Sequence, residues 1–468
     1  MDEKYQINGD ELILGNQMIP VIWRGDVAVV GGGLAGVTAA AASARRRVKT
    51  IIIEKNAFMG GRISYAAGLP IHGAFPGYVS IGGMMDELLA KLRFAGLDSA
   101  EMIDVEGFGV NYFPESEYFK YLTEDILVKS GCEILMHSLF VDVIMEQQRI
   151  LGVIVENQDG KGVILAEAVV DCTGNAQIAY KAGAAVDRSE TDTIPLIYPY
   201  ILGNVDIKRA EAHLARDCYF KCAIAKAKNE FLELSSDDKP WDLVNGLREG
   251  SLFANTIRIK KCGGDNADSL TKAEMEAHKR LFVHIEFFRK YIDGMEKCYL
   301  MRSSSQVSVL DPARIIGEET LTFEDCKGLR KFENGILRSS GPFHQLNLEA
   351  SKPDEINTIT ERDDWFEVPY GALVPKDIDN LLVAGKSISV DSKAQFTLGM
   401  AQLMVLGQAA GIAGSIVSDG KKAKEIDGRF IRSLLDEVGC DIDGDKTRQY
   451  KGDRHITLKG FDGIKSKQ

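Results

Sequence analysis

A glycine cluster, GGGLAG at 31–36, limits the folds open to this chain more than any other feature of the sequence. It follows an apolar run at 26–30 and precedes an alanine-rich stretch at 37–44, which is the order strand, turn, helix. A second apolar run at 48–53 completes a βαβ unit. The pattern therefore predicts an α/β fold with a Rossmann-type domain.

The cluster has the spacing GxGxxG, in which each glycine has its own task. Gly31 permits the tight turn, Gly33 lets a pyrophosphate approach the backbone, and Gly36 lets helix and strand pack closely. The N–H groups at the start of the helix favour phosphate. Glu54 ends the second strand, where a carboxylate accepts both hydroxyls of an adenosine ribose. These residues predict a dinucleotide site and leave FAD and NAD both open.

Changes in charge content and in hydrophobic pattern along the chain indicate three parts. Segments 20–200 and 365–420 together form the predicted dinucleotide-binding domain. Segment 200–365 is richer in charge and in helical patterns and predicts an inserted α+β substrate domain. Segment 421–468 is left as a C-terminal extension.

Within these parts several elements have clear signals. An amphipathic helix is expected at 116–130, ended by Gly131, and a turn at 157–160 joins two strands. In the insertion, Thr271 and Glu274 have capping-box spacing and predict a helix start. The basic run at 45–47 is expected to complement a helix C-terminus rather than to bind a ligand.

Further segments in the same chain resemble a known family. They are EKNAFMGGR at 54–62, DCTGNA at 171–176, PYGALVP at 369–375, NLLVAG at 380–385 and GQAAG at 407–411. In this order they resemble FAD-dependent oxidoreductases whose FAD domain is similar to that of glutathione reductase and fumarate reductase, and most of all a bacterial family within that group. The resemblance spans roughly 19–417 and implies that the dinucleotide is FAD.

The resemblance also implies where the cofactor lies. Val141 would meet the adenine through its backbone, and a helix that starts near Leu398 would aim its N-terminus at the flavin pyrimidine ring. A helix dipole there stabilises the negative charge of a reduced flavin. The residues implied at FAD are Gly31, Gly33, Leu34, Ala35, Gly36, Glu54, Lys55, Gly60, Gly61, Arg62, Val141, Thr173, Gly174, Gly385, Leu398, Gly399 and Met400.

Hydride transfer usually needs a partner that moves a proton. His344 falls where the family tends to have a histidine, and His72 follows the double glycine closely. Tyr65 is a candidate for a proton relay and Arg62 for anion binding. For any single histidine, a structural hydrogen-bonding role is the competing interpretation.

The chain departs from the family at two places that matter for the substrate. Leu398 stands where the family usually has arginine, and LDPAR at 310–314 replaces a segment with more cations. Two cationic side chains are thus missing from the expected substrate region, so the identity of the family's substrates does not carry over.

Composition excludes several classes of partner. With a net charge of −12 and a pI near 5.3, the chain lacks the basic surface that nucleic acids require. No secretory signal and no membrane span are expected, so the predicted location is cytoplasmic. The eight cysteines form no CxxC pair, which predicts free thiols and no metal site.

Three functions fit these observations. The first is an FAD enzyme that moves hydride to or from a small organic substrate. The alternatives are a non-catalytic flavoprotein subunit of a larger redox complex and an NAD-dependent dehydrogenase. Because the sequence contains a single GxGxxG, electrons are expected to pass through the substrate, a diffusible donor, oxygen or a redox partner protein. A second copy of the chain is a further partner left open.

Overall fold

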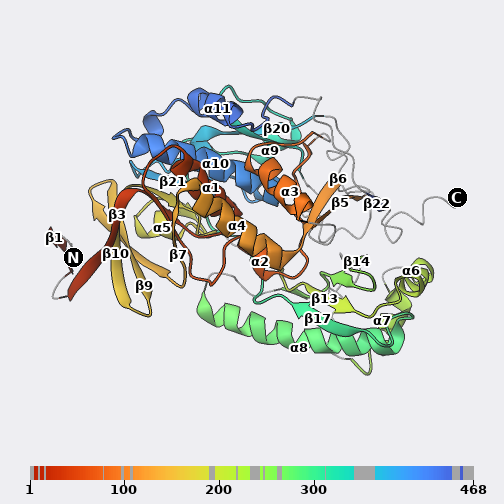
Figure 1. Cartoon of the computed structure of the whole chain (residues 1–468). Helices are drawn as coiled ribbons and strands as arrows, with labels where there is room; N and C mark the ends of the chain where they lie inside the picture. The colour runs from red at the N-terminus through yellow and green to blue at the C-terminus, as the bar shows by residue number, and fades with distance from the viewer. Residues whose placement is uncertain are drawn as a thin grey trace.

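The computed structural model describes 5–8, 11–14, 17–76, 79–95, 100–105, 109–188, 195–217, 220–231, 234, 243–245, 248–260, 266–310, 312–341, 364–444 and 454–456. These residues form two lobes (Figure 1). The larger lobe is α/β and holds most of the buried core, and the smaller lobe is built on one long helix with its own core.

A parallel sheet forms the centre of the larger lobe, with the strand order β7–β4–β3–β10–β21. Its strands are β7 (Glu133–Leu135), β4 (Thr50–Ile53), β3 (Gln17–Val30), β10 (Gly160–Asp171) and β21 (Leu381–Val383). Alternate residues of β3 belong to different hydrophobic cores, as expected of a parallel strand covered on both faces. The predicted Rossmann-type α/β fold is confirmed. Strand β3 begins earlier than its apolar run because its first half also pairs with β10.

Two helices from distant parts of the sequence pack against each other on one face of this sheet. They are α1 (Leu34–Arg45) and α10 (Met400–Val417) (Figure 1). A Cβ on Gly407 would overlap the backbone of Ala35, so only glycine permits this approach. The Thr38 hydroxyl donates across the contact to the Met404 carbonyl at 2.8 Å. Among the described helices, α10 alone has the length and hydropathy of a membrane span, and 94% of that span is buried in the protein.

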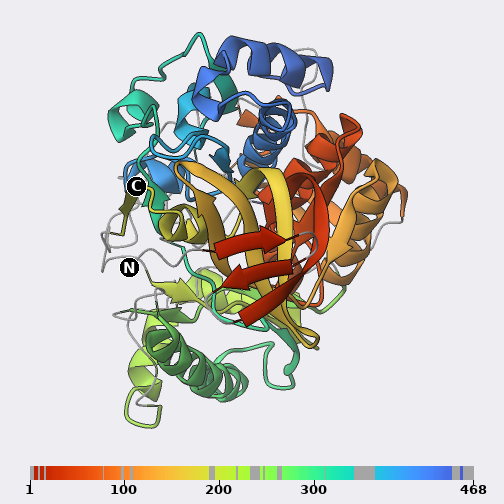
Figure 2. The ribbon, with the colours of Figure 1, turned by 90° about the vertical axis from the view of Figure 1, so that its left-hand side faces the viewer.

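An antiparallel meander extends the sheet. Strands β8 (Leu139–Glu146) and β9 (Arg149–Asn157) lead into β10, with the turn where it was predicted. Helix α4 (Ser116–Ser130) is also confirmed, and Gly131 ends it with a φ of 83° in the left-handed region. Figure 2 views the end of the molecule where β1 and β2 continue the sheet beyond β3.

The smaller lobe packs the helix α8 (Ala267–Tyr291) against short antiparallel strands. Its predicted start at Thr271 is wrong. The side chain of Asn266 accepts a hydrogen bond from the Ser269 N–H and caps the helix one turn earlier. The Thr271 hydroxyl donates to the Ala267 carbonyl at 2.7 Å and the Glu274 carboxylate accepts from the Val307 N–H, so both residues of the presumed capping box make other contacts.

The hydrophobic cores place the boundaries between the two lobes at other residues than the domain boundaries expected from the sequence. The core of the smaller lobe contains buried residues from 196 to 307. Strand β19 (Gly335–Ser339) and helix α11 (Gly428–Glu437) contribute to the core of the larger lobe. The second half of the expected insertion and the first part of the expected C-terminal extension therefore pack with the α/β lobe, because their apolar faces cover α10 and its neighbours.

The remaining elements are shorter. They are β1 (Tyr5–Asn8), β2 (Glu11–Leu14), α2 (Arg62–Tyr65), α3 (Met84–Phe94), β5 (Ala100–Val105), β6 (Gly109–Pro114), α5 (Gln177–Lys181), β11 (Val186–Asp187), β12 (Leu196–Ile197), β13 (Tyr200–Gly203), α6 (Ile207–Arg216), α7 (Lys221–Ala227), β14 (Leu243–Asn245), β15 (Leu252–Ala254), β16 (Arg258–Ile259), β17 (Tyr299–Ser303), β18 (Arg314–Ile315), α9 (Phe323–Lys327), β20 (Phe366–Pro369), η6 (Tyr370–Leu373), η7 (Ala394–Thr397), η8 (Ala423–Glu425) and β22 (Arg454–Ile456).

Candidate functional site

The glycine loop between β3 and α1 has the geometry that its spacing predicts. Gly31 has a φ of 105°, and a Cβ there would overlap the Cys172 carbonyl. A Cβ on Gly36 would overlap the Gly31 carbonyl, so helix and loop touch at that point. A Cβ on Gly33 would meet no atom within 4 Å in the described structure. The loop is thus tightly packed behind and open in front, which is the cradle that a pyrophosphate needs.

Glu54 lies beside this loop and organises it. Its buried carboxylate accepts from the Gly32 N–H at 2.6 Å and from the backbone and side chain of Asn56 at 2.8 and 2.6 Å. The Ser138 N–H donates to the Glu54 carbonyl, which brings the start of β8 to the same place. Val141 follows in β8 at an irregularity of the strand pairing. The backbone three residues before Val141 therefore lies against Glu54. That this region holds the adenosine stays a prediction.

The double glycine closes over the loop from the other side. The Gly60 N–H donates to the Gly32 carbonyl at 2.8 Å. Gly61 has a φ of 55°, and a Cβ there would stand 2.8 Å from the Gly33 Cα. Gly385, with a φ of 100°, lies against Ala35 at the start of α1. The double glycine and the much later Gly385 thus converge on the glycine loop.

Asp171 orders the loop that follows β10. One carboxylate oxygen accepts from the N–H and hydroxyl of Thr173 at 3.0 and 2.7 Å, and the other accepts from the N–H groups of Ile178 and Ala179. Burial raises the pKa of Asp171, while these donors act in the opposite direction. The result is a fixed turn that presents Thr173 and the exposed Gly174 next to the glycine loop.

The start of α10 contacts the segment that carries His72. Gly399 caps the helix, and its N–H donates to the Gln402 side chain. The Ala401 N–H donates to the His72 carbonyl at 3.1 Å. Leu398 is 1% exposed and packs in the core of the α/β lobe. The start of α10 at Met400 agrees with the helix start expected near Leu398, and His72 is held against its first turn.

Charged side chains gather near His72. The pKa of His72 is lowered to about 3 by burial and by the positive charges of Arg62 and Lys386. Arg62 begins α2, and burial lowers its pKa as well. Its buried Nε has no hydrogen-bond partner among the described residues. Lys386 follows Gly385 directly, so both cations lie beside the segments assigned to the cofactor.

The smaller lobe contacts the larger lobe at α2, the helix that begins with Arg62. The Ser308 hydroxyl donates to the Tyr65 hydroxyl at 3.3 Å, and the Ser305 N–H donates to the Tyr65 carbonyl. Arg302 donates to the Ser64 carbonyl at 2.9 Å and pairs with Glu117. Tyr65 therefore lies where the two lobes meet.

Most of the predicted cofactor residues lie near the glycine loop, and a few do not. The residues that lie in the glycine loop or on segments beside it are Gly31, Gly33, Gly36, Glu54, Gly60, Gly61, Thr173, Gly174 and Gly385. Leu34 and Ala35 are buried in α1, and Lys55 is exposed. His344 lies outside the described residues. Sequence reasoning missed Lys386. The pattern that could have indicated it is a lysine directly after a predicted buried strand and a glycine.

The donors around the glycine loop suit a dinucleotide. No group of three or more His, Cys, Asp or Glu side chains able to hold a metal ion occurs within the described ranges. Six cysteines there are free, as predicted. The open Gly33, the helix start behind it and the carboxylate of Glu54 together fit the pyrophosphate and ribose of FAD.

Comparisons with known proteins agree with this geometry. The model of the family described as FAD dependent oxidoreductase matches residues 26–435. Thiamine thiazole synthases of Aeropyrum pernix and Methanococcus vannielii are both 29% identical, over 164 and 158 residues, or 32% of this chain in each case. The chain spans about half the length of these curated relatives, 55% and 56%.

Solved structures with a similar fold have lower sequence identity to this chain. A geranylgeranyl bacteriochlorophyll reductase-like protein from Thermoplasma acidophilum is 15% identical with a TM-score of 0.47, covering 89% of this chain and 84% of that one. The flavin-dependent brominase Bmp2 is 12% identical with a TM-score of 0.47, covering 88% and 84%.

Proposed function

Because the chain belongs to the FAD dependent oxidoreductase family and its cofactor is FAD, we propose that it is an enzyme that moves hydride between flavin and a small organic anion. Bound FAD supplies the group that accepts or gives the hydride. The observation that carries the proposal is the buried Nε of Arg62, which has no hydrogen-bond partner among the described residues and lies on α2, the helix that the smaller lobe contacts.

An anion is favoured because two cations lie in a partly buried place. Arg62 and Lys386 are both only partly exposed, and both act on the same imidazole. The Arg62 Nε is a buried donor with no acceptor among the described residues. A buried donor is costly unless it meets an acceptor. A substrate carboxylate or phosphate supplies one.

His72 suits a proton-transfer role that depends on this anion. With a pKa of about 3, its ring is neutral at pH 7 in the protein alone. A substrate anion beside Arg62 and Lys386 offsets their field, so the pKa of His72 rises toward the range in which imidazole exchanges protons efficiently. Tyr65 is the second candidate, on the side of the smaller lobe. His344 stays a candidate from the sequence alone.

The residues also account for the departures from the family pattern. The buried Leu398 cannot bind an anion, and the buried Arg314 is paired with Asp187 at 2.8 Å. Arg62 and Lys386 take the place of the missing cations, which favours a different anion from those of the family. Electrons then leave through a second substrate, oxygen or a redox partner protein, and the proposed location is cytoplasmic. The family match sets NAD aside as the bound cofactor.

The test is anaerobic screening of organic acids for bleaching of the bound flavin, with the matching amides and alcohols as uncharged controls. We expect bleaching by an acid and not by its neutral analogue. Lys386→Met should retain FAD and slow bleaching at low acid concentration, whereas Lys421→Met, at an exposed position, should not. Equal bleaching by neutral compounds would contradict the anion. A flavin that no metabolite bleaches, but that a partner protein reduces, would favour the non-catalytic flavoprotein instead.

A further inference from the structure

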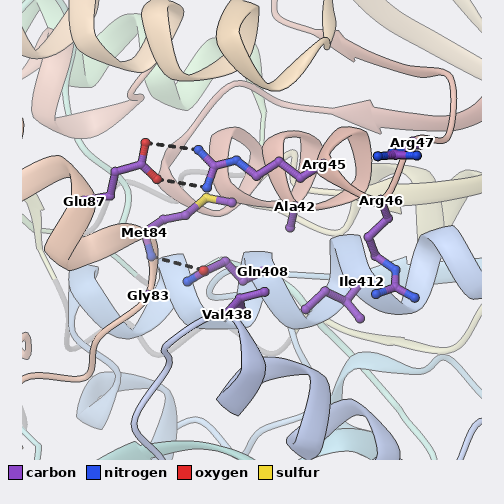
Figure 3. Close-up of a pocket in the computed structure, with 10 residues that line it drawn as sticks. All are labelled: Ala42, Arg45, Arg46, Arg47, Gly83, Met84, Glu87, Gln408, Ile412 and Val438. Atoms are coloured by element: carbon purple, nitrogen blue, oxygen red, sulfur yellow. Dashed lines mark hydrogen bonds and ion pairs between the residues drawn. The ribbon is translucent and has the colours of Figure 1, made fainter.

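A pocket of about 580 Å³ lies between α1, α3 and α10, at the end of α1 away from the glycine loop (Figure 3). Two polar groups in its walls are bonded within the protein. The Gln408 amide accepts from the Met84 N–H at 3.1 Å and is hydrogen-bonded to the Cys440 thiol. At the opposite end of the pocket, Arg46 donates to the Ser415 hydroxyl at 2.7 Å. No single ligand group could therefore reach both.

A different buried amide, that of Gln395, fixes the main chain of Lys386. Gln395 belongs to η7 and is 0% exposed. Its Nε2 donates to the Lys386 carbonyl at 2.7 Å and to the Pro312 carbonyl at 3.2 Å. The next carbonyl along the chain, that of Ser387, accepts from the Ile315 N–H at 3.0 Å. Two hydrogen bonds to successive carbonyls thus hold the main chain that carries Lys386.

The following residue of η7, Phe396, lies beside the charged end of Lys386. The Lys386 Nζ is 5.6 Å from the centroid of the Phe396 ring, within the range of cation–π attraction. The ring is buried and packs with Ile197 and Leu310, near the two ends of the segment that forms the smaller lobe. Helix η7 therefore holds Lys386 at two points, its main chain and its ammonium group.

A buried cation orients Gln395 in turn. Arg314 is 1% exposed and donates to the Gln395 Oε1 at 3.3 Å and to the Asp187 carboxylate at 2.8 Å. Because a guanidinium only donates, the amide must turn its oxygen toward Arg314 and its NH₂ group toward the Lys386 carbonyl. Arg314 therefore fixes which way the Gln395 amide points, although it is itself too deeply buried to meet a substrate.

We propose that Gln395 is a positioning residue for the substrate anion and that it acts through Lys386. This rests on the proposed function, in which Lys386 is one of the two cations beside the anion. A lysine carries its charge on a flexible four-carbon stem, and ordering such a side chain weakens binding. Because η7 holds Lys386 in advance, the anion meets an ammonium group that is already in place.

The experiment is a double-mutant cycle between Gln395→Met and Lys386→Met on FAD-bound protein. Inorganic sulfate is the probe, titrated by calorimetry at constant ionic strength, because it carries charge but has no hydride to give. We expect Gln395→Met to weaken sulfate by about fivefold or more when Lys386 is present, the scale of ordering one long side chain. In the Lys386→Met background the same substitution should change the affinity by less than about twofold.

Asn380→Leu is the matched control, because it removes another fully buried amide that is bonded to main-chain groups. Asn380 lies at the other end of β21 and bonds to the N–H and carbonyl of Ile150 and to the carbonyl of Glu167. We expect this variant to lose stability and to bind sulfate within about twofold of the wild type. A loss of affinity caused only by a less stable protein would appear in this control as well.

Gln395→Asn is the second variant, to be used if Gln395→Met does not fold. It keeps a polar amide that is too short to bridge Arg314 and Lys386, and the same loss is expected. An unchanged sulfate affinity, or equal losses with and without Lys386, would overturn the positioning role and leave the proposed anion site in place. If Lys386→Met itself did not weaken sulfate, the anion site of the proposed function would be wrong, and the positioning role with it.

Discussion

Gly36 lies so close to Gly31 that a Cβ on residue 36 would overlap the Gly31 carbonyl oxygen, whereas a Cβ on Gly33 would meet no atom within 4 Å in the described structure. The two glycines therefore have different tasks. Gly33→Val should fold as well as the wild-type protein without cofactor but bind no FAD, because its side chain fills the space of the pyrophosphate. Gly36→Val should fail to fold stably even without FAD.

Thermal melting of the FAD-free proteins, together with the FAD content after purification, separates these two outcomes. If Gly33→Val retained FAD at the wild-type ratio, the cradle would be assigned to the wrong residues.

Glu54→Ala should weaken FAD binding more mildly. The carboxylate accepts from Gly32 and Asn56 and has lone pairs left for the ribose hydroxyls. Loss of hydrogen bonds to a charged acceptor costs about 1.5–3 kcal/mol, or roughly ten- to 150-fold in Kd. Glu54→Gln keeps one carbonyl acceptor and should lose less. Titration of the FAD-free protein with FAD, followed by flavin fluorescence, measures both, and unchanged affinity of the alanine variant would remove Glu54 from the site.

His72 should make the protein sensitive to acid. Its pKa is near 3 in the folded protein and 6.5 for an ordinary imidazole, so between these pH values the unfolded chain binds a proton that the native protein does not. The stability contributed by the neutral ring is present above pH 6.5 and is lost progressively as the pH falls toward 3. His72→Gln should therefore lose less stability between these pH values than the wild type. Urea midpoints across that range measure the difference, and parallel losses in both proteins would argue against the depressed pKa.

Arg338 should be among the most sensitive positions for stability. It is fully buried and donates to the carbonyls of Pro76, Val79 and Ser80 and to the backbone and side chain of Asp441. Arg338→Met leaves these acceptors and a buried carboxylate without their partner, at a cost of about 3–5 kcal/mol in the free energy of unfolding.

The exposed Arg429, paired with Asp427, is the control, and Arg429→Met should cost less than about 1 kcal/mol. Denaturant unfolding compares the two variants, and similar losses would show that the buried network matters little.

The sequence predicted what local chemistry determines. The glycine loop, Glu54 and the glycine that ends α4 each follow from backbone conformations or hydrogen bonds within a few residues. The start of α8 was misplaced because Thr271 and Glu274 have the spacing of a cap, while Asn266 lies earlier and caps the helix instead.

Arrangements that depend on tertiary contacts could not be predicted from the sequence. Arg62 and Lys386 both act on His72 only because β21, the strand before Lys386, pairs with β10 in the sheet that contains β3. The pocket beside Gln408 likewise depends on how α3 and α10 meet. No local spacing indicates either arrangement, since each joins segments that are distant in the chain.

The contact between α1 and α10 has a consequence for synthesis. Thr38 and Met404, which are hydrogen-bonded across it, are 366 residues apart, and β21 and Gly385 also come late in the chain. A ribosome adding about 5–20 residues per second exposes α1 roughly 20–70 s before α10 is made. During that time the alanine-rich face of α1 lacks its cover and the cofactor lacks one wall of its site. Nascent chains of this protein should therefore engage chaperones, and FAD should be captured only after nearly all of the chain described here has left the ribosome.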